Sequence, residues 1–330
     1  MTKIISGIQP SGKLHIGNYL GAIKNWVKLQ SDQKNDCFFF IADYHSITED
    51  CDSKQKTKEI LDLAIDLLAL RLNPKKSVIF QQSQIPFHTE LAWIFNALVK
   101  IPELERMTQF KDKAKEQKHN INVGLFDYPA LMAADILIYK AEAVPVGEDQ
   151  VQHLELTREI AHRFNDKFGK TFLEPKSILT ETPKIMSLSD PTKKMSKSGG
   201  DKSYIALTDS PEIIKEKIKS AVSDAGGQGK NAGGDNLLSI FNALAETKEE
   251  KIEYMNYKKD HEAGKLKYSE FKPRLAELII NYFADYRQKR AELSKNPDYV
   301  KKILRDGAQK ASTIAEKTLQ EIKQKIGLII

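Results

Sequence analysis

A histidine, an asparagine and a lysine lie in a turn whose residue types suit phosphate binding. The stretch QPSGKLHIGN places Lys13, His15 and Asn18 between an apolar run at residues 3–8 and a segment with near-helical apolar spacing. Its glycines let a ligand approach the backbone, and the unpaired N–H groups at a helix start attract anions. Ordinary strand-to-helix turns use the same residue types, so this stretch alone leaves a nucleotide site and a plain turn equally open.

A second cluster of such residue types lies far along the chain. Lys194–Ser198 reads KMSKS, is preceded by Asp190-Pro191 and is followed by two glycines. Two lysines and two hydroxyls between residues that break regular structure could close over a polyphosphate. Taken alone, KMSKS is more commonly a solvated lysine loop. Chance is a poor explanation, however, for finding both KMSKS and QPSGKLHIGN in one chain.

The bulk composition is that of a globular, water-soluble protein. The chain has 330 residues, 41% hydrophobic and 29% charged, with a net charge of +6, which allows one large or two ordinary domains. The apolar run at 38–42 is too short to cross a membrane, and the N-terminal stretch lacks the pattern of a signal peptide. Cys37 and Cys51 have no C-x-x-C spacing, so neither a disulfide framework nor a zinc or other metal site is indicated. We expect a cytoplasmic protein with no membrane partner.

The first part of the chain alternates strand-like and helix-like segments. This rhythm predicts an α/β fold, a doubly wound, Rossmann-like parallel sheet with helices packed over it. The expected strands are residues 3–8, 37–48, 77–85 and 143–146, and the expected helices start near 18 and span 56–72, 88–101, 128–140 and 148–164. Trp26 and Trp93 lie on apolar helix faces and are expected in the core.

The second part is predicted to be helical throughout. Helices are expected at 211–222, 237–246, 248–264, 268–294 and 310–327. The glycine-rich stretch 226–236 resembles a nucleotide loop only superficially, and we predict a surface connection there. We therefore expect a catalytic domain at 1–208 and a helical domain at 209–330, whose last helix could pack back on the first domain.

One helix carries a carboxylate in apolar company. Tyr128, Met132 and Asp135 fall at i, i+4 and i+7, on one face of the predicted helix. A lone buried carboxylate is costly without a donor, so Asp135 either faces solvent or an arginine, or accepts a hydrogen bond from a ligand. The sequence pattern leaves both open.

Together these stretches resemble the class I aminoacyl-tRNA synthetases, in which HIGH and KMSKS motifs bind ATP, and more narrowly their bacterial tryptophanyl branch. The last position of the HIGH motif is Asn18 here, a variation that the tryptophanyl branch commonly shows. The matching stretches are residues 6–12, 103–111, 128–139, 144–150 and 185–198.

The resemblance implies a two-step reaction. The carboxylate of L-tryptophan attacks the α-phosphate of ATP and releases pyrophosphate, and the tryptophanyl group then passes to tRNA(Trp). An ionised carboxylate needs no protein base, so this chemistry calls for alignment and for charges that stabilise the leaving pyrophosphate. Mg²⁺ should arrive with ATP, held mainly by phosphate oxygens and water.

The resemblance also assigns residues to ATP. His15 and Asn18 would hold phosphate or ribose oxygens, and Lys194 and Lys197 would close on the β- and γ-phosphates, with Lys111 as a third lysine near phosphate. The catalytic residues implied are His15, Asn18, Lys111, Lys194 and Lys197. The ATP-binding residues implied are Gln9, Pro10, Ser11, Gly17, Asn18, Gly147, Glu148, Asp149, Ile185, Lys194, Met195, Ser196, Lys197 and Ser198.

Tryptophan would be selected mainly by Asp135. The indole ring has one N–H donor and no acceptor, so an acceptor-only carboxylate complements it. Ile5 replaces a phenylalanine that the family often carries, and His45 could line the pocket or satisfy a loop backbone. The tryptophan-binding residues implied are Asp135, Ile5, His45, Tyr128, Met132, Val144, Val146 and Gln150.

The resemblance further implies a homodimer and a helical domain that binds the tRNA anticodon region. Three rival functions stay open at this point. The sister tyrosyl-tRNA synthetase is the nearest, but MAADIL and GEDQ favour the tryptophanyl branch. A small-molecule nucleotidyltransferase would not need the helical domain, and a non-catalytic RNA-binding paralogue usually loses the motif lysines that this chain keeps.

Overall fold

The chain folds into two compact units, each built from separate stretches of sequence. The computed structural model describes residues 1–49, 52–111, 121–179, 184–223 and 231–329. The first unit consists of Met1–Gly12, Asn25–Thr180 and Leu293–Ile330, and the second of Lys13–Lys24 and Glu181–Glu292. Each unit is therefore discontinuous in sequence, whereas the two domains expected before and after residue 208 are each one continuous stretch.

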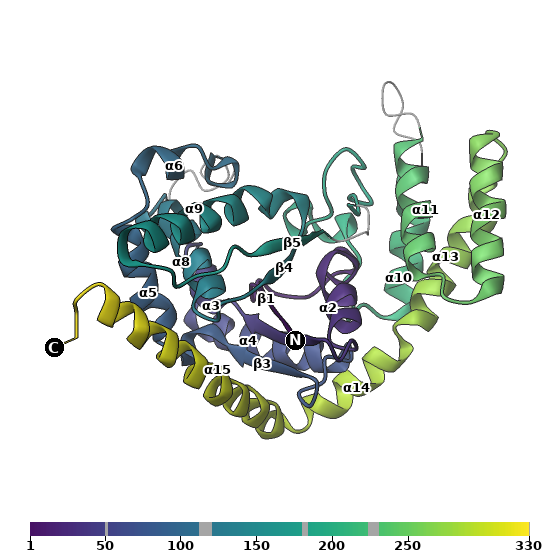
Figure 1. The fold of residues 1–330 in the computed structure, drawn as a ribbon. Coiled ribbons are helices and arrows are strands. Elements are labelled where there is room, and N and C mark those ends of the chain that lie inside the picture. The colour runs from purple at the N-terminus through teal and green to yellow at the C-terminus, as the bar shows by residue number, and fades with distance from the viewer. Residues whose placement is uncertain (50–51, 112–120, 180–183, 224–230, 330) are drawn as a thin grey trace. The chain divides into compact units, whose positions relative to one another are not determined.

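The first unit contains a five-stranded parallel sheet in the order β3-β2-β1-β4-β5 (Figure 1). This order, with β1 in the interior and the chain winding outward in both directions, is the doubly wound α/β arrangement predicted from the sequence. The strands are β1 (Thr2–Ile8), β2 (Asn35–Ile41), β3 (Ser77–Gln81), β4 (Ala143–Val146) and β5 (Lys176–Leu179). The edge strand β5 was not predicted because its side chains are mostly exposed, so its sequence lacks an apolar run.

The register of the sheet places several loops at one edge. Ile8 pairs with Ile41, and Ile41 with Gln81, so β1, β2 and β3 end side by side. Since the carboxyl ends of parallel strands share one edge, the residues that follow these strands begin from a common side of the sheet. This is the side where ligands bind in doubly wound folds.

The helices of the first unit include a tightly packed group, in which α8 contacts both α5 and α9. Pro129 lies inside α8, and the helix is capped by Asn122, whose side chain accepts from the N–H of Leu125. The helical segments are α2 (Lys24–Leu29), α3 (Asp43–Ser46), α4 (Ser53–Ala69), η2 (Gln82–Gln84), α5 (Phe87–Asn96), α6 (Ile101–Glu105), α8 (Val123–Leu137), η3 (Glu148–Gln150), α9 (Val151–Phe168) and α15 (Pro297–Lys325).

The last long helix, α15, packs directly on the sheet of the first unit (Figure 1). It contacts β3, α4 and α5, and Gly307 is the point of closest approach: a Cβ atom there would lie 1.9 Å from the backbone oxygen of Ile79. The ion pair between Lys140 and Glu321, 2.7 Å, fastens the helix further along. Only glycine lets this helix lie so close to the strand.

We expect Gly307→Ala to destabilise the first unit by about 1–3 kcal/mol, since the neighbouring atom is backbone and cannot step aside. Both tryptophans, Trp26 and Trp93, lie in this unit, so urea unfolding followed by tryptophan fluorescence reports on it. The control Gln309→Ala introduces the same residue at an exposed position of α15 and should change stability by less than about 0.5 kcal/mol. Equal stability of the two variants would contradict the close approach.

The second unit is helical apart from short paired segments. Its helical stretches are α1 (Ile16–Asn18), the π-helix η1 (Tyr19–Ile23), η4 (Lys197–Gly199), η5 (Asp201–Ser203), α10 (Pro211–Ser220), α11 (Ala232–Leu244), α12 (Lys248–Glu262), α13 (Tyr268–Tyr282) and most of α14 (Ala284–Ser294). The predicted single helix over 268–294 is interrupted at Phe283, which is buried against Tyr19 and Tyr286.

Other expectations need correction. The strand predicted over 37–48 ends at Ile41, because the polar residues that follow form α3 and bond to neighbouring loops. Helix α15 begins at Pro297, well before the predicted start, with Asn296 as its cap. Of the predicted connection 226–236, residues 226–230 lie outside the described part, and 232–236 belong to α11.

The two tryptophans differ in burial. Trp26 is buried and stacks on Phe39, with ring centroids 4.8 Å apart, as expected. Trp93 is 78% exposed, so its predicted place in the core is wrong. Helix α5 buries Leu91 and Phe95, and at 100° per residue Trp93 points away from that face.

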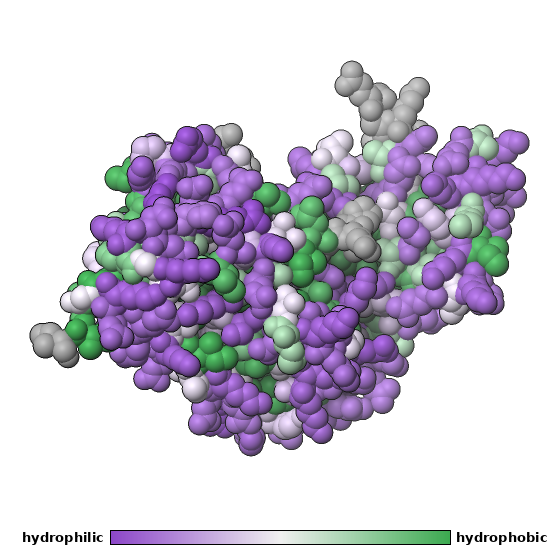
Figure 2. All heavy atoms as spheres, in the orientation of Figure 1, coloured by the Kyte–Doolittle hydropathy of each residue, from purple (hydrophilic) through white to green (hydrophobic). Residues whose placement is uncertain are grey.

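No helix within the described ranges combines the length and apolarity needed to span a bilayer. The face of the molecule seen in Figure 2 is covered mainly by hydrophilic residues, with hydrophobic ones in small groups.

Candidate active site

The HIGN turn, His15–Asn18, belongs to the second unit and is ordered by its own side chains. The Nδ1 atom of His15 accepts from the backbone N–H of Asn18 at 3.3 Å, and the Oδ1 atom of Asn18 accepts from the backbone N–H of His15 at 3.1 Å. This reciprocal capping box starts the helical stretch that continues through η1. Asn18 therefore has a structural task in the turn, besides any contact with a ligand.

The KMSKS segment, Lys194–Ser198, is held in the same unit by backbone pairing. The N–H of Met195 donates to the carbonyl of Ile185 at 2.9 Å, and the N–H of Ser187 donates to the carbonyl of Lys193 at 2.8 Å. Ile185 and Met195 are both buried. This short antiparallel pairing fixes where the two lysines leave the backbone, with Lys194 exposed and Lys197 half-buried.

The HIGN turn and the KMSKS segment meet. A Cβ atom at Gly17 would lie 3.6 Å from the Cβ of Met195, an ordinary contact distance, so the two segments are close neighbours. On the other side, the N–H of Ile16 donates to the carbonyl of Ile205 at 3.0 Å, and the ring of His15 faces that of Tyr204. Two stretches about 180 residues apart in sequence are thus adjacent in space, as their resemblance to a nucleotide site requires.

The imidazole of His15 is held neutral. Burial, together with the positive charges of Lys197 and Lys194, lowers its pKa to about 4. Because Nδ1 accepts from Asn18, the ring proton of the neutral form lies on Nε2. His15 can therefore donate one hydrogen bond from Nε2 at neutral pH, and it adds no charge to the two lysines.

This pKa predicts a pH dependence of stability. The folded pKa of about 4 lies below the ordinary value of 6.5, so the unfolded chain binds the proton more readily. The contribution of neutral His15 is complete above pH 6.5 and is lost as the pH falls towards 4, by up to about 3 kcal/mol. Urea unfolding by circular dichroism from pH 7.5 to 4 should show a shallower fall for His15→Asn, which keeps a capping side chain. Parallel curves for both proteins would refute the lowered pKa.

Side chains outside the motifs anchor the KMSKS segment. The hydroxyl of Ser203 donates to the carbonyls of Ser196, 2.6 Å, and Gly200, 2.7 Å. Further along, at the residue that pairs with His15, the N–H of Ala206 donates to Asp209, which forms an ion pair with buried Lys217, 2.8 Å. Sequence reasoning missed these anchors, and only the lysine on the apolar face of the predicted helix 211–222 signalled one of them.

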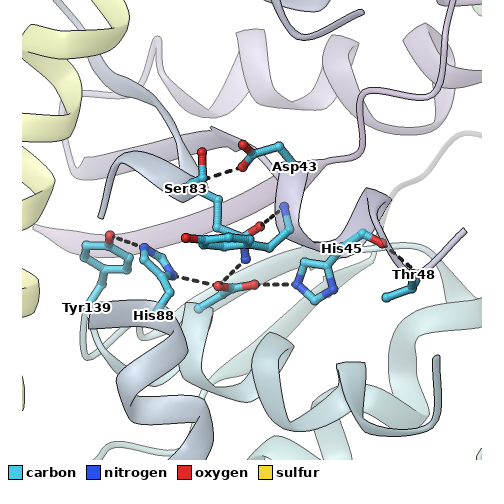
Figure 3. A network of polar contacts seen from close by, with 9 residues as sticks. Asp43, His45, Thr48, Ser83, His88 and Tyr139 are labelled. Carbon is cyan, nitrogen blue, oxygen red and sulfur yellow. Dashed lines mark hydrogen bonds and ion pairs between the residues drawn. The ribbon is translucent and has the colours of Figure 1, made fainter. Parts of the chain in front are cut away.

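In the first unit, Asp135 is the centre of a buried polar network (Figure 3). Its side chain leaves α8 and is 1% exposed. The Oδ2 atom lies 2.7 Å from Nε2 of His45, and Oδ1 accepts from Nε2 of Gln82 at 2.7 Å and lies 2.6 Å from Nδ1 of His88. Among the described residues, the partners of the Asp135 carboxylate are thus two histidines and a glutamine, and neither solvent nor an arginine takes that place.

The carboxylate of Asp135 is ionised. Burial raises its pKa, but the hydrogen bonds from His45 and His88 and their charge outweigh burial, so the pKa is lowered. A carboxylate in this form is an acceptor only, which is the property predicted for recognition of an indole N–H.

Sequence reasoning missed Gln82, His88 and Tyr139, which complete this network. The Nε2 atom of His88 lies 2.8 Å from the hydroxyl of Tyr139, and Figure 3 shows His88 between Tyr139 and the rest of the network. A histidine at the start of a predicted apolar helix was a signal that we did not use. His45 lies in α3 rather than at a strand end, and its ring also faces that of Tyr128.

The other residues predicted to bind tryptophan lie in different surroundings. Ile5, Val144 and Val146 are buried members of one hydrophobic cluster, against which Met132 is packed. The hydroxyl of Tyr128 lies 2.7 Å from Nε2 of His153. Helix α8 thus directs Asp135 and Met132 towards the interior of the first unit, as the helical spacing predicted.

Two predicted ATP-binding loops follow strands of the first unit. Gln9, Pro10 and Ser11 follow β1, and the carbonyl of Pro10 accepts from Lys56 at 3.0 Å. Gly147 precedes η3, where Gln150 donates to Asp149 at 3.1 Å and Glu148 is exposed. The loops therefore leave the same edge of the sheet.

Lys111 is exposed at the end of a described stretch, and its backbone N–H donates to the carbonyl of Met107. Its side chain is not brought into the networks described above, so its proposed contact with phosphate rests on the motif alone.

Comparison with known proteins settles the family. Residues 1–284 match the family model described as tRNA synthetases class I (W and Y). The chain belongs to this family. It is 46% identical to a tryptophan–tRNA ligase of Rickettsia conorii, with 99% of both chains covered, and 44% identical to one of Clostridium tetani, with 99% of this chain and 96% of the relative covered.

Solved structures of family members agree with this assignment. The tryptophanyl-tRNA synthetase of Campylobacter jejuni, in complex with ADP and tryptophan, is 37% identical, with a TM-score of 0.83 over 99% of this chain and 100% of that one. The enzyme of Mycoplasma pneumoniae is 36% identical, with a TM-score of 0.88 over 99% and 98% of the two chains. A tyrosyl-tRNA synthetase of Archaeoglobus fulgidus, at 20% identity, shares the fold.

Proposed function

We propose that this chain is a tryptophan–tRNA ligase. In the first step, a carboxylate oxygen of L-tryptophan attacks the α-phosphorus of ATP, the bond to the β-phosphate oxygen breaks, and pyrophosphate leaves. In the second step, the terminal ribose hydroxyl of tRNA(Trp) attacks the acyl carbon, and AMP leaves. The full-length similarity to bacterial enzymes of this name supports the proposal over the tyrosyl alternative.

The observation that carries the choice of amino acid is the buried, ionised carboxylate of Asp135. An acceptor-only group suits the indole N–H and selects for that donor, whereas a tyrosine hydroxyl can also donate to a carboxylate, so the size of the pocket must reject tyrosine. A phenylalanine side chain would leave the remaining acceptor position of Asp135 unpaired, at a cost of roughly 1–3 kcal/mol. This difference is large enough for selection.

For ATP, we propose that the HIGN turn and the KMSKS segment bind the triphosphate. The Nε2–H of His15 would donate to an oxygen, while Lys194 and Lys197 would neutralise the charge that grows on the leaving pyrophosphate. The segment's lysines and hydroxyls suit phosphate oxygens, and it carries no carboxylate, the side chain that usually holds Mg²⁺ in proteins. The ion would therefore arrive on ATP, held by phosphate oxygens and water.

The remaining assignments follow the motifs. Further contacts with ATP are proposed for Gln9, Pro10, Ser11, Gly17, Asn18, Lys111, Gly147, Glu148, Asp149, Ile185, Met195, Ser196 and Ser198. Contacts with tryptophan are proposed for Ile5, His45, Tyr128, Met132, Val144, Val146 and Gln150, beside Asp135.

We further propose that residues 209–330 include the surface that binds the tRNA anticodon, that the enzyme works in the cytoplasm, and that it is a homodimer. Two large apolar side chains on successive helices support a dimer contact on the first unit: Trp93 is 78% and Ile101 64% exposed. A second copy covering them would remove apolar surface from water.

Exchange of labelled pyrophosphate into ATP tests the function. Exchange should depend on L-tryptophan and should be at least 100-fold slower with tyrosine or phenylalanine at equal concentration. Charging of tRNA(Trp) by the same preparation tests the second step. Equal exchange with tyrosine would move the assignment to the tyrosyl branch. Exchange without any amino acid would mean that the chain does not catalyse activation of an amino acid.

A further inference from the structure

The two oxygens of the Asp135 carboxylate differ in how many partners they have. Oδ1 accepts from Gln82 and faces Nδ1 of His88, whereas Oδ2 faces only Nε2 of His45 among the residues that the structure describes. A carboxylate oxygen offers two lone-pair directions. Oδ1 is therefore saturated, and Oδ2 retains one acceptor position.

His88 is the residue that links this carboxylate to the core. It is completely buried, its Nδ1 lies 2.6 Å from Asp135 and its Nε2 lies 2.8 Å from the hydroxyl of Tyr139. Its ring is also close to those of Phe40 and Phe80. A position among aromatic rings is filled at lower cost by an apolar side chain, so packing alone does not account for a histidine here.

The hydrogen bonds also fix the proton on this ring. Asp135 can only accept, so Nδ1 of His88 carries the hydrogen and donates. Burial, together with the charge of Asp135, holds the pKa of Tyr139 well above its usual value, so its hydroxyl keeps its proton and lies 2.8 Å from Nε2 of His88. A hydrogen-bonded chain thus runs from Tyr139 through His88 to Oδ1 of Asp135.

We propose that His88 is a positioning residue for tryptophan selection: together with Gln82 it saturates Oδ1 of Asp135, so that the one acceptor position left on Oδ2 takes the indole N–H. The inference rests on the proposed function, since it needs tryptophan as the ligand. It goes further by naming the oxygen that accepts and the residues outside the binding motifs that orient it.

The consequence is a specific pattern of affinities. Without the donor at Nδ1, Oδ1 keeps only Gln82 as a partner and regains an acceptor position, which competes for the ligand's N–H in poorer geometry. Affinity for tryptophan then falls, but affinity for an isostere that has sulfur in place of the N–H does not depend on this bond. A role of His88 in packing alone would weaken both ligands equally.

The test compares L-tryptophan with L-3-benzothienylalanine, whose ring carries sulfur at the N–H position, by calorimetry on the full chain. We expect His88→Leu to weaken tryptophan by roughly tenfold or more and the analogue by less than about threefold. His88→Asn places an amide donor near the position of Nδ1 and should restore most of the preference for tryptophan. The control His162→Leu makes the same change at an exposed histidine and should alter neither affinity.

Tyr139→Phe keeps the experiment decisive if His88→Leu does not fold. It preserves the ring that stacks on Phe38, 5.4 Å between centroids, and removes only the hydroxyl that bonds to Nε2 of His88. We expect a selective loss of tryptophan affinity of roughly two- to tenfold. Equal losses for both ligands, or an unchanged preference in every folded variant, would overturn the role of His88.

The wild-type protein separates this inference from the proposed function. If it neither binds tryptophan nor exchanges pyrophosphate with it, the proposed function fails first. If it prefers tryptophan to the analogue and all His88 and Tyr139 variants keep that preference, only the positioning role fails.

Discussion

Replacing Lys197 with alanine is expected to slow formation of tryptophanyl-adenylate by roughly 100-fold or more, because one charge placed to stabilise the leaving pyrophosphate is lost. Tryptophan affinity should change by less than about twofold, since the indole is proposed to contact Asp135 and Lys197 is proposed to contact phosphate. The backbone around Lys197 begins the short helix η4, which alanine preserves. Rapid-quench measurement of the first turnover gives the rate of the chemical step directly.

The matched control is Lys193→Ala. Lys193 precedes the KMSKS segment, is exposed and pairs only at the surface with Asp190, 3.1 Å. Its replacement removes the same charge from the same loop and should leave the rate within about twofold. A normal burst of adenylate in Lys197→Ala, or an equal loss in the control, would show that Lys197 has no special role.

Asp135→Asn should weaken tryptophan by roughly 10- to 100-fold while ATP affinity changes little. The amide presents one acceptor oxygen and one donor nitrogen where three donors, from His45, Gln82 and His88, now converge. One donor must then lose its partner, and the acceptor for the indole N–H is disturbed as well. Calorimetric titrations with tryptophan and with ATP separate the two effects.

Asp127→Asn on the same helix is the matched control. Asp127 is half-buried and accepts from Asn96 at 2.7 Å, outside the network of Asp135. It should leave tryptophan affinity within about twofold. If tryptophan affinity is unchanged in Asp135→Asn, the carboxylate of Asp135 does not accept the indole N–H.

The fold could be predicted from the sequence wherever burial produces a recognisable pattern of apolar residues along the chain. Strands covered on both faces, such as β2, are continuous apolar runs, and amphipathic helices such as α9 show their period. The exposed edge strand β5 leaves no such trace. The break at Phe283 lacks a glycine or proline, and the ring there contacts Tyr19, which is distant in sequence, as well as the nearby Tyr286.

The residues of the candidate site likewise fall into those that the sequence pattern predicts and those that it does not. Asp135 and the KMSKS segment are visible because their chemistry is unusual for their local surroundings. His88, Gln82 and Tyr139 are ordinary residues on three different elements, and they become partners only when the sheet and helices assemble. Local periodicity carries no information about such pairings, which depend on tertiary distance.

Helix α15 places a limit on the order in which this protein can form during translation. In the described part of the chain, strand β3 packs closely against α15, residues 297–325. The ribosome must therefore deliver these late residues before the first unit can close, while β3, made much earlier, waits without this helix. Binding of a chaperone to nascent chains would be concentrated on that strand.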